Sequence, residues 1–582
     1  MSQVIEKGII ASPGIRIGKA FLYHGQTIII RKYTIREDEV SIEISRFEKA
    51  VEQTKNEIKA IQEQIASSLS KDMGDIFTSH IMVLEDPQIE EKVRTTIIEK
   101  KRNAEWAIND ISMELTNSLS GIKDEYLRER IIDISDINKR LISNLQKTES
   151  SSTLQNIDEE VIVFAPDLTP SETAEMNREH IIAFVTDRGG RTSHTAIMAR
   201  ALEIPAIVGT INATSQVKNG DIVIIDAVHG RIIIDPTEDE IREYRRYEED
   251  FHELEIELSK LTNLPARTTD RQEVSIYGNI EIPEEMKIIK DHGAQGIGLF
   301  RSEFLFMDKS LPDEEKQFQE YKRVAEYFKP MPVTIRTIDV GADKVYAYTN
   351  HYRERNPFLG CRAIRFSLLN EDLFRIQLRA ILRASHFGTV RLMFPMITAI
   401  EEFKRARKIT GEVMQELRNE GIPFDEKIKI GIMIEVPSAV IYADVLARYA
   451  DFFSVGTNDL VQYLLAVDRI SEKIAYLYNP LNLSVLRFLK QIVDTANKHS
   501  VPISICGEIA GEPQYTMVLI GLGFRHLSMG PVYMYQVKKI IRSVTIKECE
   551  SMVRDMLKLE NTDDIEQLVR KKFKEKFYEL SK

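Results

Sequence analysis

With 582 residues, of which 43% are hydrophobic and 29% charged, the chain has a globular composition, and at roughly 150 residues per domain its length predicts three or four domains. Seventy-eight basic against 90 acidic residues give a formal net charge of −12, which argues against nonspecific binding to nucleic acid. A cytoplasmic protein is expected, because there is no membrane-length apolar run, no signal-peptide layout at the N-terminus, and only three widely separated cysteines.

The chain begins with glycine-punctuated β-type runs and then changes to long helical patterns. Up to about residue 35, runs such as Lys7–Gly14 and Gly18–Tyr23 predict two or three strands with turns. From about residue 36, apolar residues recur at helical spacing, and the charged positions between them belong either to solvated faces or to a docking surface. Successive amphipathic runs predict a helical bundle: Glu39–Ser68, Asp75–Leu84, Pro87–Lys100, Ala104–Leu119 and Tyr126–Leu145.

A serine-rich break at residues 149–153 ends the bundle, and short apolar strands resume after it. The economical interpretation is one α/β domain made of residues 1–35 and 148–235, with the helical bundle of residues 36–147 inserted into it. Residues 236–262 are highly charged at helical spacing and predict a connecting helix between domains. The expected strands are residues 160–164, 181–185, 206–209, 221–226 and 230–234.

The stretch Asp187–Arg200 joins the second of these strands to a helix. Two glycines allow a tight turn, a Thr-Ser pair supplies favourable N-cap residues, and the run from Thr195 to Leu202 predicts the helix. His194 is thus expected in the first turn, where unpaired N–H groups and the helix dipole favour an anion. A neutral imidazole there is able to accept a phosphoryl group. The alternative, which composition alone favours, is a histidine with no chemical role.

After residue 265 the pattern becomes a strand followed by a helix, repeated along the chain. Several of these strands are almost entirely apolar, as expected where both faces are buried. Eight such units predict a (β/α)8 barrel of the TIM type, placed in residues 263–582 with a peripheral helical tail. The expected strands are Val274–Gly278, Gly296–Phe300, Val333–Thr337, Val390–Phe394, Lys429–Glu435, Asp451–Gly456, Pro502–Cys506 and Arg525–Met529.

Reactive residue types fall at the C-terminal ends of these strands, the face at which such a barrel carries its chemistry. Two hard oxygen ligands, Glu435 and Asp459, suit Mg²⁺. Cys506 offers a thiol able to protonate the carbon of a departing enolate. Arginine forks suit phosphate and carboxylate, so the set fits a small substrate bearing both groups, although each residue alone has an equally good structural explanation. The other members are Arg301, Arg336, Arg362, Asn458, Arg469 and Glu508.

Two groups of motifs resemble known proteins. The string Gly-Gly-Arg-Thr-Ser-His-Thr-Ala-Ile at residues 189–197 is similar to the phosphohistidine signature of phosphoenolpyruvate-utilising enzymes, which favours the chemical interpretation of His194. The segments 300–307, 431–437, 456–460 and 506–511 resemble Enzyme I of the bacterial sugar phosphotransferase system, the phosphoenolpyruvate–protein phosphotransferases. This likeness extends over nearly the whole chain, including residues 80–87 of the expected bundle.

The resemblance implies a mechanism and a set of roles. Phosphoenolpyruvate binds with Mg²⁺ at the barrel mouth, the phosphohistidine domain swings in, and Nε2 of His194 takes the phosphoryl group. Cys506 protonates the enolate to pyruvate, and His194 then passes the phosphoryl group to the carrier protein HPr, docked on the helical bundle. Family members are homodimers joined through their barrels. The resemblance and the barrel-mouth set together give Arg301, Arg336, Arg362, Asn458, Asp459 and Arg469 for the substrate, with Glu435 and Asp459 for the metal.

Several features of the sequence distinguish this family from the alternatives. Pyruvate phosphate dikinase and phosphoenolpyruvate synthase need an ATP-binding domain, for which the chain offers no convincing glycine-rich phosphate loop. A nitrogen-type paralogue is expected to add an N-terminal sensory domain, whereas Gly8 already begins the histidine domain. A silent phosphorelay regulator or scaffold would require a lost catalytic residue. Ala342, Cys361 and Gly530 depart from the expected pattern, and none is a named ligand.

Overall fold

In the computed structural model the chain forms two compact units, Met1–Leu254 and Glu255–Lys582. No helix in the described part of the chain is both long and apolar enough to cross a lipid bilayer. The structure describes residues 2–5, 8–25, 30–68, 78–120, 125–146, 154–174, 176–177, 179–190, 194–202, 204–281, 283–306, 311–340, 356–468 and 474–580.

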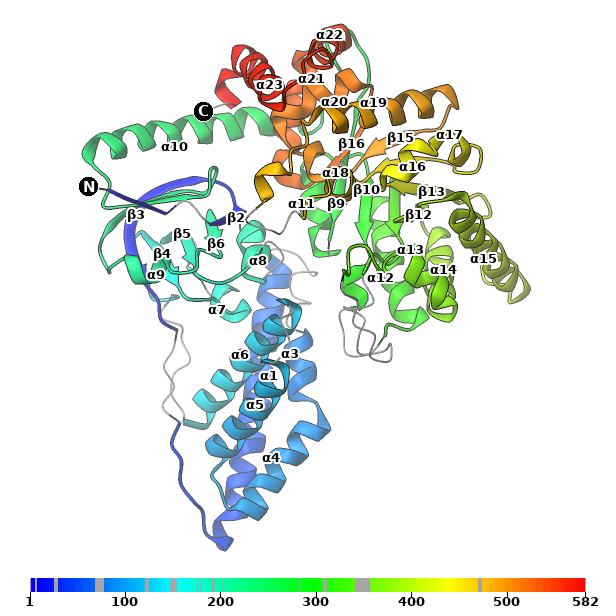
Figure 1. The fold of residues 1–582 in the computed structure, drawn as a ribbon. Helices are drawn as coiled ribbons and strands as arrows, with labels where there is room; N and C mark the ends of the chain where they lie inside the picture. The colour runs from blue at the N-terminus through cyan, green and yellow to red at the C-terminus, as the bar shows by residue number, and fades with distance from the viewer. Residues whose placement is uncertain are drawn as a thin grey trace. The chain divides into compact units, whose positions relative to one another are not determined.

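The first unit contains an eight-stranded mixed sheet with the strand order β1-β8-β7-β3-β4-β5-β6-β2 (Figure 1). The central strands β3 to β6 pair in parallel, and the outer strands pair antiparallel. Strand β4 is buried along its whole length, which explains its continuous run of apolar residues. The strands are β1 (Gln3–Ile5), β2 (Ile9–Ser12), β3 (Ile15–Leu22), β4 (Val161–Ala165), β5 (Ile181–Thr186), β6 (Ala206–Val208), β7 (Ile222–Asp226) and β8 (Arg231–Ile234).

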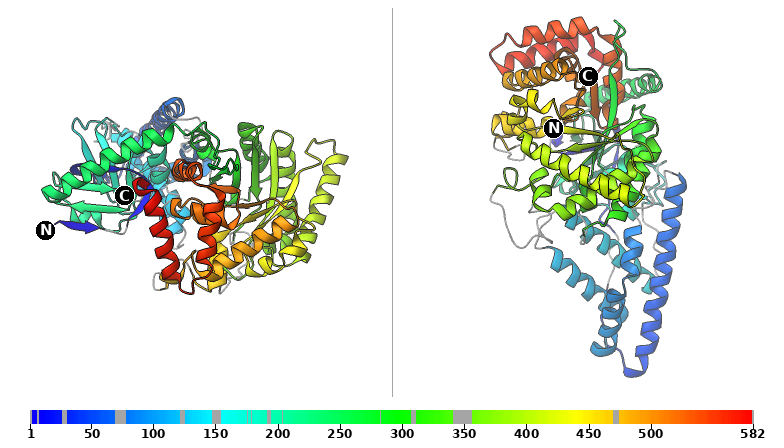
Figure 2. Two further views of the ribbon diagram at one scale, coloured as in Figure 1. Left: turned by 90° about the horizontal axis from the view of Figure 1, so that it is seen from above. Right: turned by 90° about the vertical axis from the view of Figure 1, so that its right-hand side faces the viewer.

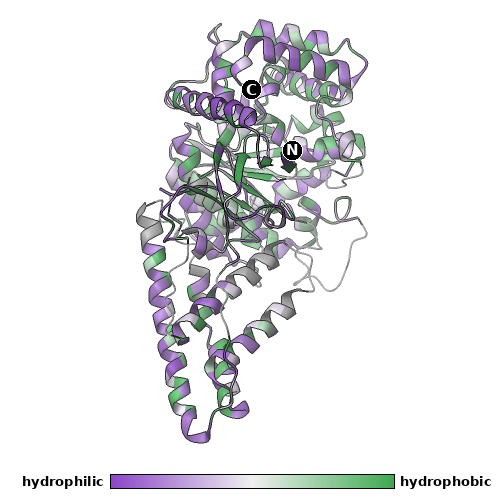
Figure 3. Cartoon of the chain, turned by 90° about the vertical axis from the view of Figure 1, so that its left-hand side faces the viewer, coloured by the Kyte–Doolittle hydropathy of each residue, from purple (hydrophilic) through white to green (hydrophobic). Residues whose placement is uncertain are grey.

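Three short helices connect the strands of this sheet, and a set of longer helices lies between β3 and β4 in the sequence. Green and purple alternate along the long helices in Figure 3, as expected for amphipathic helices with one buried face. Their apolar core includes the buried side chains of Phe47, Ile97 and Ile142. The helices are α7 (Pro170–Ala174), α8 (His194–Leu202) and α9 (Ala213–Gln216) beside the sheet, and α1 (Val40–Ser68), α3 (Thr78–Leu84), α4 (Pro87–Lys100), α5 (Ala104–Ser120) and α6 (Glu125–Gln146) in the bundle.

Helix α10 (Glu238–Ser259) follows the last strand of the sheet and extends beyond the end of the first unit. Tyr244 of α10 packs with Ile15, Ile224 and Ile233 of the sheet. Thr237 and Glu240 form a reciprocal pair of hydrogen bonds at the N-terminus of the helix, which satisfies two backbone donors. The structure divides the chain into only two compact units. The four domain ranges expected from the sequence therefore stay a prediction.

The second unit is built on a closed barrel of eight parallel strands, which confirms the predicted (β/α)8 architecture. The strand borders differ from the expected ones by at most two residues. Figure 2 shows the connecting helices on the outside of the strands. The strands are β9 (Ser275–Ile280), β10 (Ile297–Arg301), β11 (Pro332–Arg336), β12 (Thr389–Phe394), β13 (Lys429–Ile434), β14 (Phe453–Val455), β15 (Ile503–Ile505) and β16 (His526–Met529).

One large apolar core lies between the barrel and its helices and includes the fully buried rings of Phe300, Phe328 and Phe394. The C-terminal tail of the chain is helical, as expected. The helices of this unit are α11 (Met286–Asp291), α12 (Glu314–Phe328), α13 (Ile364–Leu369), α14 (Glu371–Ser385), α15 (Ile400–Asn419), α16 (Pro437–Ile441), α17 (Ala443–Leu446), α18 (Thr457–Leu465), α19 (Leu483–Lys498), α20 (Thr516–Leu522), α21 (Met534–Ser543), α22 (Ile546–Met556) and α23 (Thr562–Lys576), with the 3-10 turn η3 (Glu303–Phe306) after β10.

Candidate active site

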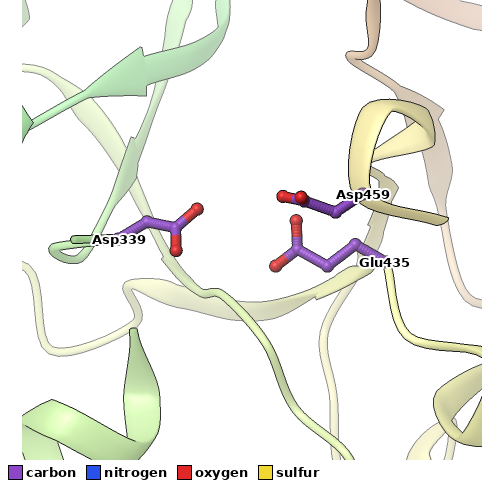
Figure 4. Close-up of side chains that lie close together, drawn as sticks. All are labelled: Asp339, Glu435 and Asp459. Atoms are coloured by element: carbon purple, nitrogen blue, oxygen red, sulfur yellow. The ribbon is translucent and has the colours of Figure 1, made fainter. Parts of the chain in front are cut away.

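Three carboxylates meet at the C-terminal end of the barrel strands. Glu435 follows β13, Asp459 lies in the first turn of α18 after β14, and Asp339 lies three residues beyond the end of β11. One oxygen atom from each lies within 4.8 Å of the other two. Figure 4 shows Asp339 pointing across the strand ends toward the other two side chains. Parallel strands bring these residues together although Asp339 and Asp459 are 120 positions apart in sequence.

Glu435 is the most deeply buried member of this acidic cluster, with 1% of its surface exposed. Burial raises the pKa of its carboxyl group well above the usual range, and the charges of Asp339 and Asp459 raise it further. The backbone N–H of Met396 donates a hydrogen bond of 2.6 Å to Oε1 of Glu435. Met396 has a φ of 56°, a left-handed conformation that is unusual for this residue and that coincides with its contact to Glu435.

Two arginines link the carboxylates. Nη1 of Arg336 lies 2.9 Å from Oδ2 of Asp339, and Nη2 of Arg362 donates to Oδ1 of the same residue at 2.8 Å. Nη2 of Arg362 also lies 3.3 Å from Oδ2 of Asp459. Asp339 therefore bridges both guanidinium groups while it also faces Glu435. The neighbouring carboxylates raise the pKa of both arginines, so both stay fully charged.

The balance of charges fits a divalent cation. Four carboxyl groups lie among two guanidinium groups here, so two negative charges would be left uncompensated if all four were ionised. The atoms close enough to share a metal ion are all carboxylate oxygens. Such ligands suit Mg²⁺ and Mn²⁺ better than they suit softer metals. The groups counted are Asp339, Glu435, Asp459 and Glu303 against Arg336 and Arg362.

Cys506 follows β15 and lies in an apolar pocket among Leu299, Met393, Met433 and Phe452. Only 3% of it is exposed, and burial raises the pKa of the thiol to about 11. The charges of Arg336, Glu435 and Arg301 act on this thiol, which places it beside the same strand ends. The thiol is therefore neutral at physiological pH and carries a proton.

Arg301, Arg362 and Asn458 also come from the ends of barrel strands or from the segments that follow them. Arg301, at the end of β10, pairs with Glu281 and keeps 34% of its side chain exposed. Asn458 exchanges two hydrogen bonds with Glu508, accepting from its backbone N–H at 2.9 Å and donating to Oε1 at 3.2 Å. Arg362, beyond its carboxylate partners, donates to the hydroxyl of Tyr463 at 3.2 Å. Arg469 and Ala342 lie outside the described residues.

His194 is the first residue of α8, in the first unit. The expected N-cap residues before it, Thr192 and Ser193, lie outside the described residues. The adjacent Thr195 is buried, and its hydroxyl donates to the carbonyl oxygen of Leu168 at 2.8 Å. This bond fixes the start of α8 against the segment that leads into α7. The histidine is thus placed at a helix N-terminus, as the sequence predicted.

Sequence reasoning missed two residues of this site. Asp339 received no role in the sequence analysis, although its position three residues after Arg336 was a usable signal. The Met396 amide had no signal, because a backbone donor carries no mark in the sequence. Cys361, which departs from the expected pattern, is partly buried and packs against the barrel core.

Gly456 offers a test of how tightly the acidic cluster is packed. A Cβ atom at this position would lie 2.8 Å from Oε2 of Glu435. Gly456→Ala should displace that carboxylate and lower the affinity for Mg²⁺ about tenfold. Titration with Mg²⁺, followed by calorimetry, measures this effect.

The control for this substitution is Gly411→Ala in the middle of α15, where a Cβ atom meets nothing within 4 Å. It should stabilise the protein by roughly 0.5–1 kcal/mol through helix propensity and leave Mg²⁺ affinity unchanged. Equal Mg²⁺ affinities of the Gly456→Ala variant and the unmodified protein would show that Glu435 is not held against Gly456 as described.

Family models match most of the chain. Residues 7–130 match the N-terminal domain of PEP-utilising enzymes, residues 157–230 match their mobile domain, and residues 255–546 match their PEP-binding domain. The acidic cluster, both arginines and Cys506 all lie within the third match, and His194 lies within the second.

Curated relatives match over nearly the full length. The chain is 39% identical over 568 residues to the phosphoenolpyruvate-protein phosphotransferase of Priestia megaterium, covering 97% of this chain and 99% of that protein. It is 42% identical over 563 residues to the protein of the same name from Haemophilus influenzae, with 97% and 98% covered. Among solved structures, the NMR solution structure of an Enzyme I protein (nEIt) is 43% identical, covering 42% of this chain and 99% of that one, with a TM-score of 0.36.

Proposed function

Since the chain belongs to the phosphoenolpyruvate-protein phosphotransferase family, we propose that His194 is its phosphoryl acceptor and that the barrel mouth of the second unit is its phosphoenolpyruvate site. The enzyme transfers the phosphoryl group of phosphoenolpyruvate to a carrier protein. The observation that supports this site most strongly is the buried acidic cluster bridged to two arginines at the strand ends. Arginines that can bind anions lie there beside carboxylates that can bind a metal ion. This arrangement suits a substrate with phosphate and carboxylate groups that binds together with a metal ion.

In this proposal the arginines hold the substrate. Arg301, Arg336 and Arg362 supply planar donors that match phosphate and carboxylate oxygens. Arg336 and Arg362 are held by Asp339, so little conformational freedom is lost when the anion binds. Asn458, Asp459 and Arg469 complete the substrate set that the family resemblance implies.

Glu435 and Asp459 are the proposed ligands of a Mg²⁺ ion, with Asp339 close enough to act as a third. Such an ion would neutralise charge on the phosphate and carboxylate of the substrate. The raised pKa of Glu435 supports this assignment, because a carboxylate buried among like charges needs a cation to stay ionised. One oxygen atom of each carboxylate lies within 4.8 Å of the other two, close enough for the three residues to reach one ion.

The chemistry assigned to the chain's own residues is a single transfer followed by a protonation. Nε2 of His194 forms a bond to the phosphorus atom while the bond from phosphorus to the enol oxygen breaks. The released enolate takes a proton at carbon from Sγ of Cys506, which gives pyruvate. A thiol with a pKa near 11 is weakly acidic but is protonated whenever the enolate forms, and the surrounding apolar side chains exclude water that would compete.

The partner and the assembly are proposed on the same family basis. HPr is the proposed carrier, docked on the helical bundle, where Ile42, Ile98 and Met113 are large apolar side chains left exposed. A homodimer through the barrels is proposed, supported by the exposed apolar side chains of Ile441 and Tyr476 in the second unit. Reaction in the cytoplasm fits a chain whose cysteines form no disulfide.

The proposed function is tested by following pyruvate release with and without a carrier. With phosphoenolpyruvate and Mg²⁺ alone, the protein should release at most one pyruvate per chain. Addition of HPr should convert this into sustained release together with phosphorylated HPr. A silent regulator or scaffold would bind HPr but release no pyruvate, and that result would favour the alternative function.

A further inference from the structure

A row of five alternating charges runs along the strand ends from β10 to α18. Each neighbouring pair in it forms an ion pair between 2.6 and 3.3 Å in length. Four of the five groups are the carboxylates and arginines already assigned, and the fifth lies at the β10 end. In order, the row is Glu303, Arg336, Asp339, Arg362 and Asp459.

Glu303, the first residue of η3, has no role in the proposed chemistry so far. Its Oε1 accepts a hydrogen bond of 2.6 Å from Nη2 of Arg336 and one of 3.1 Å from the backbone N–H of Asp339. One oxygen atom thus fixes both members of the next ion pair in the row. Its side chain is 13% exposed, so the contact to Arg336 is largely protected from water.

The backbone segments that carry these residues are anchored independently of Glu303. The buried side chain of Gln377 donates from Nε2 to the Ser302 hydroxyl at 3.1 Å. Its Oε1 accepts from the backbone N–H of Ile338 at 3.0 Å. The segments just before Glu303 and Asp339 are therefore held together by Gln377, and the distinct contribution of Glu303 is its hold on the Arg336 guanidinium.

Arg336 and Glu303 each keep one buried polar atom without a hydrogen-bond partner among the described residues, Nε of the arginine and Oε2 of the glutamate. Buried polar atoms in this state are rare in native proteins. The Nε donor of Arg336 is thus left for an additional acceptor, such as an oxygen of an anionic substrate. Oε2 of Glu303 forms no hydrogen bond among the described residues that a substitution would break.

We propose that Glu303 is a positioning residue, which holds the Arg336 guanidinium at the orientation needed to bind the phosphoenolpyruvate anion. The proposal rests on the proposed function of the barrel mouth. Arg336 contacts the substrate before and during transfer, so its correct orientation contributes to binding rather than to the chemical step. Loss of that orientation raises KM and leaves kcat nearly unchanged.

The placement of Oε1, rather than the charge of the carboxylate, is the property that this role requires. Glu303→Gln keeps an oxygen atom at the position of Oε1 and replaces only the unpartnered Oε2 with an amide nitrogen. Glu303→Asp keeps the negative charge but withdraws both oxygens by one methylene group. The two variants therefore separate position from charge.

The test measures KM for phosphoenolpyruvate, kcat and the thermal unfolding midpoint for the unmodified full-length protein and both variants, with saturating Mg²⁺ and HPr. Glu303→Asp should raise KM about tenfold with kcat within about threefold, and Glu303→Gln should keep KM within about threefold. The control is Glu314→Ala, which removes a carboxylate that binds Arg379 and Arg383 on the outside of the barrel, each at 2.6 Å. It should leave KM unchanged.

An unchanged KM in Glu303→Asp, or equal increases of KM in both variants, would overturn the proposal. KM does not depend on the folded fraction, so a destabilised variant still gives an answer: a lower unfolding midpoint with normal KM would assign Glu303 a structural role only. Failure of the unmodified protein to turn over phosphoenolpyruvate would instead contradict the proposed function itself. The two failures are thus distinguished within one experiment.

Discussion

The His194→Ala protein should take up no phosphoryl group from phosphoenolpyruvate. His194 begins helix α8, where backbone N–H groups and the helix dipole favour an anion, and alanine offers no atom that can form a bond to phosphorus. The acidic cluster lies in the other compact unit and should be unaffected, so Mg²⁺ should still bind with normal affinity. Incubation with radiolabelled phosphoenolpyruvate, followed by gel electrophoresis without acid treatment, measures the uptake.

The matched control for this experiment is His252→Ala on the exposed surface of α10. It removes an imidazole of the same chemistry from the middle of a helix rather than from its first turn. The variant should label as strongly as the unmodified protein. Normal labelling of His194→Ala would show that another group accepts the phosphoryl group, and the assignment of His194 as the acceptor would then be wrong.

Glu435→Gln should lower the rate of phosphoryl uptake about 10²- to 10³-fold, as expected for loss of a buried charge that stabilises the transferring group. The variant keeps an oxygen that accepts from Met396 but removes a negative ligand from the acidic cluster. The same substitution should raise the unfolding midpoint of the metal-free protein. The carboxylate of Glu435 is buried beside two like charges, and its raised pKa means that the folded state disfavours its ionised form.

The raised pKa also sets the direction of a pH effect in the unmodified protein. A bound cation must replace the proton on Glu435, so the apparent affinity for Mg²⁺ should fall as the pH is lowered. In Glu435→Gln this part of the pH dependence should disappear. Glu412→Gln, which changes an exposed carboxylate on α15, is the control and should alter neither property. A Glu435→Gln protein with normal activity and lower stability would contradict the assignment of Glu435 as a ligand.

Much of the fold was predictable because its signals are local. The eight barrel strands are short apolar runs bounded by turns, and each was expected within two residues of its observed position. The bundle helices were equally clear from their periodicity, since each buries one face. The boundary between the two compact units, after Leu254, lies within the range expected for the connecting helix, whereas the four domain ranges themselves stay a prediction.

The site was predictable only in part. Glu435, Asp459 and Cys506 lie at strand ends, and barrel topology alone brings such residues together. The pairing of Arg336 and Arg362 through Asp339 depends on side-chain geometry that no spacing rule contains. The same is true of Glu303, whose partners come from a different strand end and whose motif gives no hint of a contact with Arg336.

The central step is the transfer of one phosphoryl group from the barrel mouth to His194, and intact-protein and peptide mass spectrometry test it directly. After incubation with phosphoenolpyruvate and Mg²⁺, the protein should gain the mass of one phosphoryl group, located on the peptide that contains His194, lost in acid and transferred to HPr when it is added. A phosphoryl group on any other residue, or none at all, would contradict the account.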